Sequence, residues 1–296
     1  MLERHGSSVR GPEAAMRRVR ADHSERPPCG FLPALSFTRM TAAGQPAIEV
    51  SVVAPAHNEA DNVDELVRQI EAAMTPSGLT FEAVIVDDGS TDRTRELLTR
   101  AMSGRPWLRC IAMTRTPPGK GNGQSAAFHA GFRACRGGLI AVLDADLQND
   151  PAEIPAMVAR LRAAGADMVQ GDRSHARQDH AIRKIGSWVG RVFRKWLLGD
   201  TIRDTGCSLR VMKREVALAI PLEFRGMHRF IPITAIHLGY KVVEMQVKHR
   251  PRVAGETKYG MGIVQRALPG LRDLFAVRWM KARRRPTTGV EIDRPA

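Results

Sequence analysis

The most restrictive feature of this sequence is a regular alternation of short apolar runs with amphipathic stretches, which begins near residue 46. Strands are predicted at 48–54, 81–87, 108–113, 139–144 and 168–171, and helices at 60–74, 91–101, 124–135 and 151–164. Strands that alternate with helices of this length favour a mostly parallel sheet with helices on both faces. The predicted fold class is therefore α/β, and ligands are expected beyond the carboxyl ends of the strands.

The two ends of the chain and its second half depart from this pattern. Residues 1–45 are rich in Arg, Gly, Pro and Ser without a sustained period, which predicts a disordered basic segment. Further helices are predicted at 182–198, 228–237 and 263–280, the last interrupted by Pro269, and strands at 207–211 and 242–247. The expected division is a disordered segment over 1–45, one folded domain over 46–260, and a helical, basic tail over 261–296.

The charge of the chain restricts its partners. Among 296 residues, 45 Lys and Arg face 31 Asp and Glu, a formal net charge of +14. This balance favours anionic partners such as nucleic acid, nucleotide-like substrates or an acidic membrane surface. Aromatic residues make up only 5% of the chain, which argues against a nucleic-acid surface built on base stacking. The four cysteines form no CxxC pair and are expected to be reduced thiols without a zinc site.

The C-terminal segment suggests contact with a membrane. No stretch approaches the ~18 apolar residues of a spanning helix, and the N-terminus lacks the apolar core of a signal peptide. We therefore expect a cytoplasmic protein that is peripheral at the inner face of the membrane. A broad apolar arc precedes the basic cluster 281–285 and consists of Val264, Leu268, Leu271, Leu274, Phe275 and Trp279. This pattern fits an interfacial helix or, equally, a helix packed on the domain.

The run Asp144-Ala145-Asp146 at the end of a predicted strand suggests a metal–diphosphate site. Alternation along a strand places the two carboxylates on the same side. Mg²⁺ takes oxygen ligands and usually keeps phosphate oxygens among them. The alternative is a solvated acidic turn, and a second acidic region upstream favours the site.

That second region consists of the turns 55–59 and 86–92, which follow the first two predicted strands. Asp88 can accept a hydrogen bond from a base N–H, and Glu59 can hold a ribose hydroxyl. The alternative is ordinary capping by Ser90 or Thr91, although capping alone does not explain three acidic turns at one sheet edge. The glycine-rich loop 119–125 does not have P-loop spacing and is interpreted as a flexible loop beside the nucleotide.

These motifs together resemble a known family. Segments 55–59, 86–92, 124–131 and 144–148 are similar to family 2 glycosyltransferases with the GT-A fold. Segments 204–210 (DTGCSLR), 228–230 (HRF) and 249–259 (HRPRVAGETKY) resemble the polyprenyl-phosphate glycosyltransferases, which include dolichol-phosphate mannosyltransferase. Two departures are that no transmembrane helix follows the domain and that Thr257 replaces the usual Ser before a lysine.

The resemblance implies transfer of a sugar from a GDP- or UDP-linked donor to a polyprenyl phosphate, with Mg²⁺ or Mn²⁺ as cofactor. It assigns the metal to Asp144, Asp146 and Gln148, and the nucleoside pocket to Pro55, His57, Glu59 and Asp88. It assigns the acceptor phosphate to Arg173, Arg183 and Ser187, and the donor diphosphate to Arg252 and Lys258.

The residue types suit this chemistry. A lipid phosphate is already anionic near neutral pH, so arginines that bind its oxygens serve better than a strong general base. Arg183 and Ser187 are four residues apart and share one helical face, whose alternative role is a solvated basic surface. Without an obvious nucleophile near the metal, direct attack with inversion is expected.

Two competing functions remain open. A GT-A enzyme that acts on a glycan hydroxyl needs a base, for which Asp204 is the candidate. Otherwise Asp204 shapes the acceptor loop or orders an arginine. The high positive charge also permits a nucleic-acid-binding protein, although acidic turns and few aromatics oppose that function. The sequence does not identify the sugar.

Overall fold

The computed structural model describes residues 47–117, 119–175, 192–248, 250 and 263–286, without the side chains of 263–269. All of them belong to one compact unit, Met40–Ala296. The predictions made for residues 1–45 therefore lie outside the described residues.

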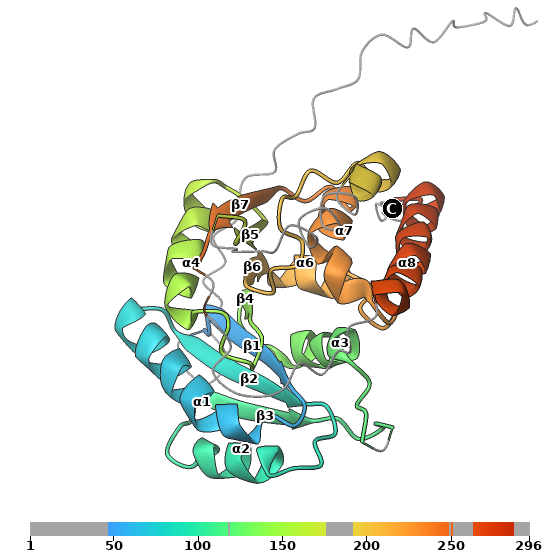
Figure 1. Ribbon diagram of the computed structural model, residues 1–296. Helices are drawn as coiled ribbons and strands as arrows, with labels where there is room; N and C mark the ends of the chain where they lie inside the picture. Colours follow the sequence, from blue (N-terminus) through green and yellow to red (C-terminus); the bar gives the residue numbers. More distant parts are fainter. Residues whose placement is uncertain (1–46, 118, 176–191, 249, 251–262, 287–296) are drawn as a thin grey trace, which may run out of the picture. The chain divides into compact units, whose positions relative to one another are not determined.

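One seven-stranded sheet organises the unit, in the order β3-β2-β1-β4-β6-β5-β7 (Figure 1). The strands are β1 (Val50–Ala56), β2 (Phe81–Asp87), β3 (Leu108–Ala112), β4 (Leu139–Val142), β5 (Met168–Asp172), β6 (Arg210–Lys213) and β7 (Val242–Gln246). β1 pairs in parallel with β2 and β4, β2 with β3, and β5 with β7, whereas β6 is antiparallel to β4 and β5. The predicted α/β class with a mostly parallel sheet is confirmed.

Helices cover both faces of this sheet (Figure 1). α1 (Ala60–Met74), α2 (Thr94–Met102) and α4 (Ile154–Ala163) contribute to one hydrophobic cluster. α3 (Gln124–Ala134), α6 (Arg214–Ala219), α7 (Ile231–His237) and α8 (Ile263–Arg283) contribute to the other. Three short 3₁₀ turns lie at Thr75–Ser77, Pro151–Glu153 and Met227–Phe230.

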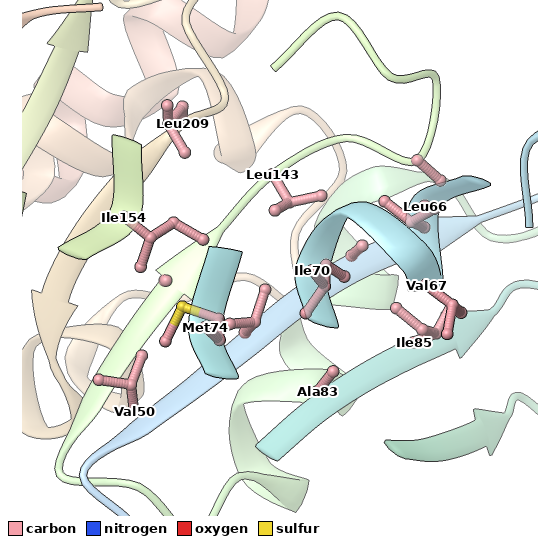
Figure 2. Packing of buried hydrophobic residues seen from close by; sticks show 14 of the residues in the cluster. Val50, Leu66, Val67, Ile70, Met74, Ala83, Ile85, Leu143, Ile154 and Leu209 are labelled. Carbon is pink, nitrogen blue, oxygen red and sulfur yellow. The ribbon is translucent and has the colours of Figure 1, made fainter. Parts of the chain in front are cut away.

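Alternation along β1 explains how one strand serves both clusters. Val50, Val52 and Ala54 pack with α1 and α4, whereas Val53 belongs to the cluster on the other face. On α1, Leu66, Ile70 and Met74 are spaced by four residues and face the sheet together (Figure 2). The strand and helix periods of the sequence therefore fix which side chains form the core.

Close packing of α3 brings its N-terminus to the sheet edge. A Cβ atom added to Gly131 would lie 2.8 Å from Val53 Cγ1 and 2.9 Å from Val86 Cγ2. Only glycine therefore permits this approach of helix to sheet. The N-terminal residue Gln124 is thereby held near the ends of the strands.

The second half differs from the prediction in several details. The strand predicted at 207–211 begins at Arg210, because the preceding carbonyls of Cys207 and Ser208 accept hydrogen bonds from the Arg210 side chain. The helix predicted over 151–164 opens with a 3₁₀ turn, and α6 was not predicted. α8 continues through Pro269, whose missing N–H removes only one backbone hydrogen bond.

The described residues cover only part of the helix predicted over 182–198. Of the helix predicted over 182–198, residues 192–198 are described and are helical. No helix among the described residues has the length and apolar character needed to cross a membrane. Cys110, Cys135 and Cys207 are free thiols, as expected.

Candidate active site

The carboxyl ends of β1, β2 and β4 meet at one edge of the sheet. Ala56 is opposite Asp87 in the β1–β2 pair, and Val53 is opposite Val142 in the β1–β4 pair. The three acidic turns 57–59, 88–92 and 144–148 therefore leave the sheet from neighbouring strands, on the side where parallel sheets bind ligands. The sequence-predicted residues Pro55, His57, Glu59, Asp88, Asp144, Asp146 and Gln148 are all on this edge.

Backbone groups of the glycine-rich loop hold the carboxylate of Asp88. Asn122 N donates to Asp88 Oδ1 at 2.8 Å, and Gly123 N donates to Asp88 Oδ2 at 2.7 Å. Gly121 has φ +62°, and a Cβ at this position would lie 2.6 Å from Asp88 Oδ2. The loop described as flexible from the sequence is thus folded around a buried carboxylate over its described residues.

The turn after β1 is tied to the turn after β2. His57 Nδ1 donates to the backbone oxygen of Asp88 at 2.8 Å. The Asn58 side chain accepts from Thr91 N at 2.8 Å, and Asn58 itself has φ +53°. The Glu59 carboxylate accepts from Asn62 Nδ2 at 2.7 Å. The contacts of His57 and Asn58 hold the two turns against each other, and the contact of Glu59 fixes its carboxylate at the start of α1.

The carboxylate of Asp144 is fixed at both oxygens. Gln124 Nε2, at the start of α3, donates to Oδ1 at 2.6 Å, and the Ser208 hydroxyl donates to Oδ2. Burial and then the neighbouring charge of Asp146 raise the pKa of Asp144 to about 6, against the lowering effect of the Ser208 hydrogen bond. Such a carboxylate favours a cation close by, because a cation lowers the cost of its charge.

The turn 144–148 keeps its polar groups at the edge while its apolar residues remain in the core. Leu147 is buried and has φ +63°, a conformation that costs a branched residue about 1 kcal/mol or more. Gln148 N donates to Asp146 Oδ1 at 3.2 Å, and Gln148 O accepts from Arg250 N at 3.1 Å. The strained turn therefore leaves Asp146 and Gln148 half-buried beside Asp144.

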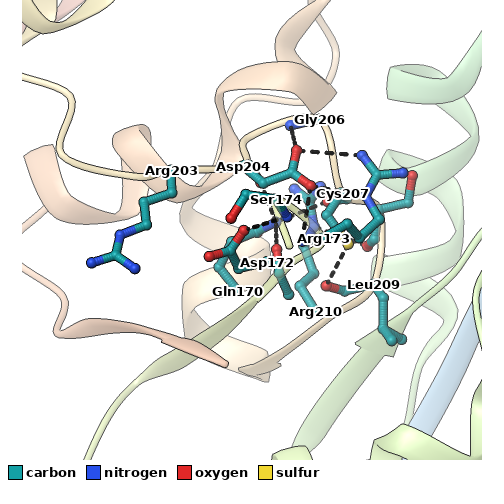
Figure 3. Close-up of polar contacts among 12 residues, drawn as sticks. Gln170, Asp172, Arg173, Ser174, Arg203, Asp204, Gly206, Cys207, Leu209 and Arg210 are labelled. Carbon is teal, nitrogen blue, oxygen red and sulfur yellow. Dashed lines mark hydrogen bonds and ion pairs between the residues drawn. The ribbon is translucent and has the colours of Figure 1, made fainter. Parts of the chain in front are cut away.

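A buried polar network lies next to this site (Figure 3). Arg173 Nε donates to Asp204 Oδ2 at 2.9 Å, and the Arg173 backbone N donates to the same oxygen at 3.2 Å. Asp204 keeps the pKa of Arg173 above its usual value despite burial. Arg210 is also buried and donates to Cys207 O at 2.6 Å, and burial lowers its pKa to about 10.

The structure thus places the predicted residues in two adjoining groups. Arg173 and Asp204 form the buried pair, which lies after β5 at the same edge of the sheet as Asp144 and is connected to it through the segment that carries Ser208. Arg183, Ser187, Arg252 and Lys258 lie outside the described residues, so their predicted roles stay predictions.

Sequence reasoning did not single out Gln124, Ser208 or Arg210. Two of them belong to the segment 204–210, where only Asp204 received a role, and the third opens a helix already recognised. The spacing of polar residues within these motifs could have indicated that Gln124, Ser208 and Arg210 belong to the site.

A second link joins α3 to the second half of the chain. Ser125 Oγ and His228 Nδ1 are hydrogen-bonded at 2.9 Å, and Ser125 Oγ accepts from the backbone N of His228 at 3.1 Å. Burial, followed by the charges of Arg229 and Arg210, lowers the pKa of His228 to about 3. The imidazole is therefore neutral near pH 7, which fits a structural role for His228 in linking α3 to the second half of the chain.

Comparison with known proteins gives a consistent result. The model of Glycosyl transferase family 2 matches residues 51–219. Dodecaprenyl-phosphate galacturonate synthase of Rhizobium johnstonii is 36% identical over 245 residues, which cover 81% of this chain and 70% of the relative. Undecaprenyl-phosphate 4-deoxy-4-formamido-L-arabinose transferase of Pseudomonas aeruginosa is 41% identical over 210 residues, which cover 71% of this chain and 60% of the relative.

A solved structure supports the fold. Glucosyl-3-phosphoglycerate synthase from Mycobacterium tuberculosis in complex with Mn²⁺ and UDP-glucose superposes with a TM-score of 0.58 at 18% identity. The superposition covers 76% of this chain and 78% of that chain. At this identity the likeness concerns the fold alone.

The glycine-rich loop 121–123, which surrounds the Asp88 carboxylate and is called the Asp88 cradle here, leads to a testable prediction. Gly121→Ala and Gly119→Ala both place alanine at a positive φ, but only the former also pushes a Cβ against Asp88. We expect Gly121→Ala to lower the free energy of unfolding by about 1–3 kcal/mol more than Gly119→Ala. Urea unfolding of both variants measures the difference, and equal losses would contradict the cradle.

The neutral His228 predicts a pH dependence of stability. As the pH falls from about 6.5 towards 3, the unfolded chain takes up a proton on this residue that the folded chain does not accept. Stability is therefore lost on acidification, by up to about 1.4 kcal/mol per pH unit from this group. His228→Asn should show a shallower slope in urea unfolding between pH 6.5 and 4.5. His175→Asn, at an exposed position, is the matched control, and identical slopes for wild type and His228→Asn would refute the assignment.

Proposed function

The chain belongs to glycosyl transferase family 2, and on this basis we propose that it transfers a sugar from a nucleotide-sugar to a polyprenyl phosphate. The family resemblance inferred from the motifs is confirmed by the matched family and by its relatives. Two of those relatives have names that specify a polyprenyl-phosphate acceptor. The chain is thus a glycosyltransferase, and its donor and acceptor are the subject of the proposal.

One observation carries the proposal furthest. Three consecutive residues connect the two acidic groups: Asn122 and Gly123 hold Asp88, and Gln124 holds Asp144. A base-and-ribose subsite at Asp88 and a diphosphate subsite at Asp144 are therefore adjacent and fixed relative to each other. This spacing suits a nucleoside diphosphate that lies along the carboxyl ends of β2, β1 and β4. Pro55, His57 and Glu59 then line the nucleoside part.

The proposed metal is Mg²⁺ or Mn²⁺. Among the described residues, no three His, Cys, Asp or Glu side chains gather around a common point. A pair of carboxylates, Asp144 and Asp146, with the Gln148 amide suits a metal that takes one or two protein carboxylates and completes its shell with phosphate oxygens and water. When bound, such an ion neutralises charge that develops on the departing diphosphate.

The proposed binding site of the acceptor phosphate consists mainly of arginines. We assign the acceptor phosphate to Arg173, Arg183 and Ser187, and further contacts with the donor diphosphate to Arg252 and Lys258. An anionic phosphate oxygen attacks the anomeric carbon directly, the bond to the nucleoside diphosphate breaks, and the configuration inverts. No proton has to be removed from the acceptor in this reaction.

The hydroxyl-acceptor alternative is less well supported. It requires Asp204 as a general base, but both oxygens of this carboxylate accept hydrogen bonds from Arg173, and Gly206 N donates to Oδ1 as well. A carboxylate stabilised in its charged form in this way is a weak base. Asp204 therefore orders Arg173, which is one of the roles expected from the sequence.

We further propose that the enzyme acts as a peripheral protein at the cytoplasmic face of a membrane, where polyprenyl phosphates reside. The division into a basic segment over 1–45, a GT-A domain over 46–260 and a helical tail over 261–296 is part of the same proposal. Nucleic acid is not a partner in it.

The metal assignment predicts the behaviour of Asp144→Asn. Removal of one carboxylate charge should lower transfer by about 10³-fold or more, because the charge of the leaving diphosphate is no longer compensated. Transfer of radiolabelled sugar from a panel of UDP- and GDP-sugars to a short-chain polyprenyl phosphate with Mn²⁺ measures this. Asp150→Asn, at a nearby helix cap, is the control, and full activity of Asp144→Asn would contradict the site.

The acceptor assignment is tested by a second pair of variants. We expect Arg183→Ala to raise the KM for polyprenyl phosphate about tenfold or more, because a charge-assisted phosphate contact is lost. Asp204→Asn should reduce kcat moderately and leave its pH profile unchanged. A loss of turnover in Asp204→Asn together with normal kinetics of Arg183→Ala would favour a hydroxyl acceptor instead.

A further inference from the structure

The large apolar side chains that are exposed in the described structure all lie after β5. They are Val192, Phe193, Trp196, Leu218, Phe224, Leu271, Phe275 and Trp279. Six of these eight lie on two helices, 192–198 and α8, and none lies between β1 and β5. Single exposed apolar residues are ordinary, whereas a group that includes two tryptophans and two phenylalanines suggests an interaction surface.

α8 has two distinct apolar faces. Leu274 and Val277 are 5% and 3% exposed and belong to the core cluster. Phe275 and Trp279 are 52% and 63% exposed and follow Leu271 at intervals of four residues. With 3.6 residues per turn, this stripe spans roughly 80° and points roughly 130° away from the packed face. The packed helix, one of the two alternatives from the sequence, is therefore confirmed for one face of α8, and the other apolar face is exposed.

The second helix is attached directly to α8. Arg278 Nη1 donates to Leu197 O at 2.8 Å, and Lys281 Nζ donates to Leu198 O at 3.0 Å. Basic side chains at the last carbonyls of a helix satisfy unpaired acceptors and complement the helix dipole. Trp196 directly precedes this junction, is 75% exposed, and its ring lies 5.8 Å from that of Phe193 in a tilted arrangement. The junction thus supports aromatic residues on two neighbouring helices.

The charges around these residues are almost all positive. Exposed basic residues on the two helices and directly after α8 are Lys195, Arg272, Arg278, Lys281, Arg283, Arg284 and Arg285. Asp273 is the single acidic residue among 192–198 and 270–286, and it faces Arg225 and Arg229. Aromatic residues flanked by arginine and lysine are typical of helices that lie in the interface of an anionic bilayer.

We propose that helix 192–198 and α8 together form one membrane-docking surface, in which Trp196 and Trp279 insert among anionic lipid headgroups. The proposal rests on the proposed function, because a polyprenyl-phosphate acceptor resides in a bilayer. Symmetric pairing of two copies through this surface is disfavoured, since it would bring the two sets of basic residues together. An anionic bilayer offers an apolar interior to the exposed aromatic residues and negatively charged headgroups to the surrounding basic residues.

Vesicle binding by the full chain tests the surface. The probes are phosphatidylcholine vesicles with and without phosphatidylglycerol, studied by co-sedimentation and by the tryptophan emission shift. We expect wild type to bind the anionic vesicles and Trp196→Ser/Trp279→Ser to bind about tenfold more weakly or worse. Arg272→Gln/Arg283→Gln should weaken binding, whereas Arg93→Gln/Arg100→Gln, which removes exposed arginines from the α2 region, should not.

The outcomes separate the surface from the enzyme activity. The tryptophan variant should match wild type on a short-chain polyprenyl phosphate in detergent and fall behind only on the same acceptor in anionic vesicles. Equal vesicle binding by wild type and the tryptophan variant, or no wild-type binding, overturns the docking surface. So does a wild-type dimer in sedimentation velocity that the tryptophan variant converts to a monomer. Vesicle binding without transfer to either acceptor overturns the proposed function and leaves the surface intact.

Discussion

The carboxylate of Asp144 is the interaction on which the site depends, because it joins three parts of the chain that are distant in sequence. Asp144 follows β4. Its carboxylate accepts one hydrogen bond from the Gln124 side chain at the start of α3 and another from the Ser208 hydroxyl before β6. Burial makes its negative charge costly, as its raised pKa indicates. The fold keeps this charge beside a second carboxylate, Asp146, and the charges of Arg210 and Arg173 offset it only in part. Stability is thus given up at the position where the proposed function places a cation and a diphosphate.

The secondary structure of the first half of the chain could be predicted from the sequence, because the local residue pattern there agrees with the strand pairing of the fold. The helix Ala60–Met74 and the strand Phe81–Asp87 have the predicted bounds, since amphipathic period and turn residues mark both ends. Parallel pairing then requires that the turns after β1, β2 and β4 share an edge, so the acidic site could be anticipated without coordinates.

The second half was less readable because tertiary contacts set its local structure. Residues 207–209 have the sequence pattern of a strand, yet the carbonyls of Cys207 and Ser208 accept hydrogen bonds from the buried side chains of Arg210 and Gln170. The partners of Asp144 and the cradle around Asp88 also depend on contacts 20 to 64 residues apart along the chain. No periodicity predicts such contacts. The split of α8 into a packed and an open face likewise became visible only when its neighbours were known.

The antiparallel direction of β6 has a consequence for how such enzymes diversify. Because β6 is antiparallel to β5, β5 ends at the edge of the sheet where β6 begins, so the connection between Asp172 and Arg210 starts and ends at that edge. Its length is therefore free to vary, since closing a longer loop costs little additional entropy. Under the proposed function, an exchange of this connection would change the acceptor side of the enzyme, while the strand ends that carry Asp88 and Asp144 would keep their arrangement.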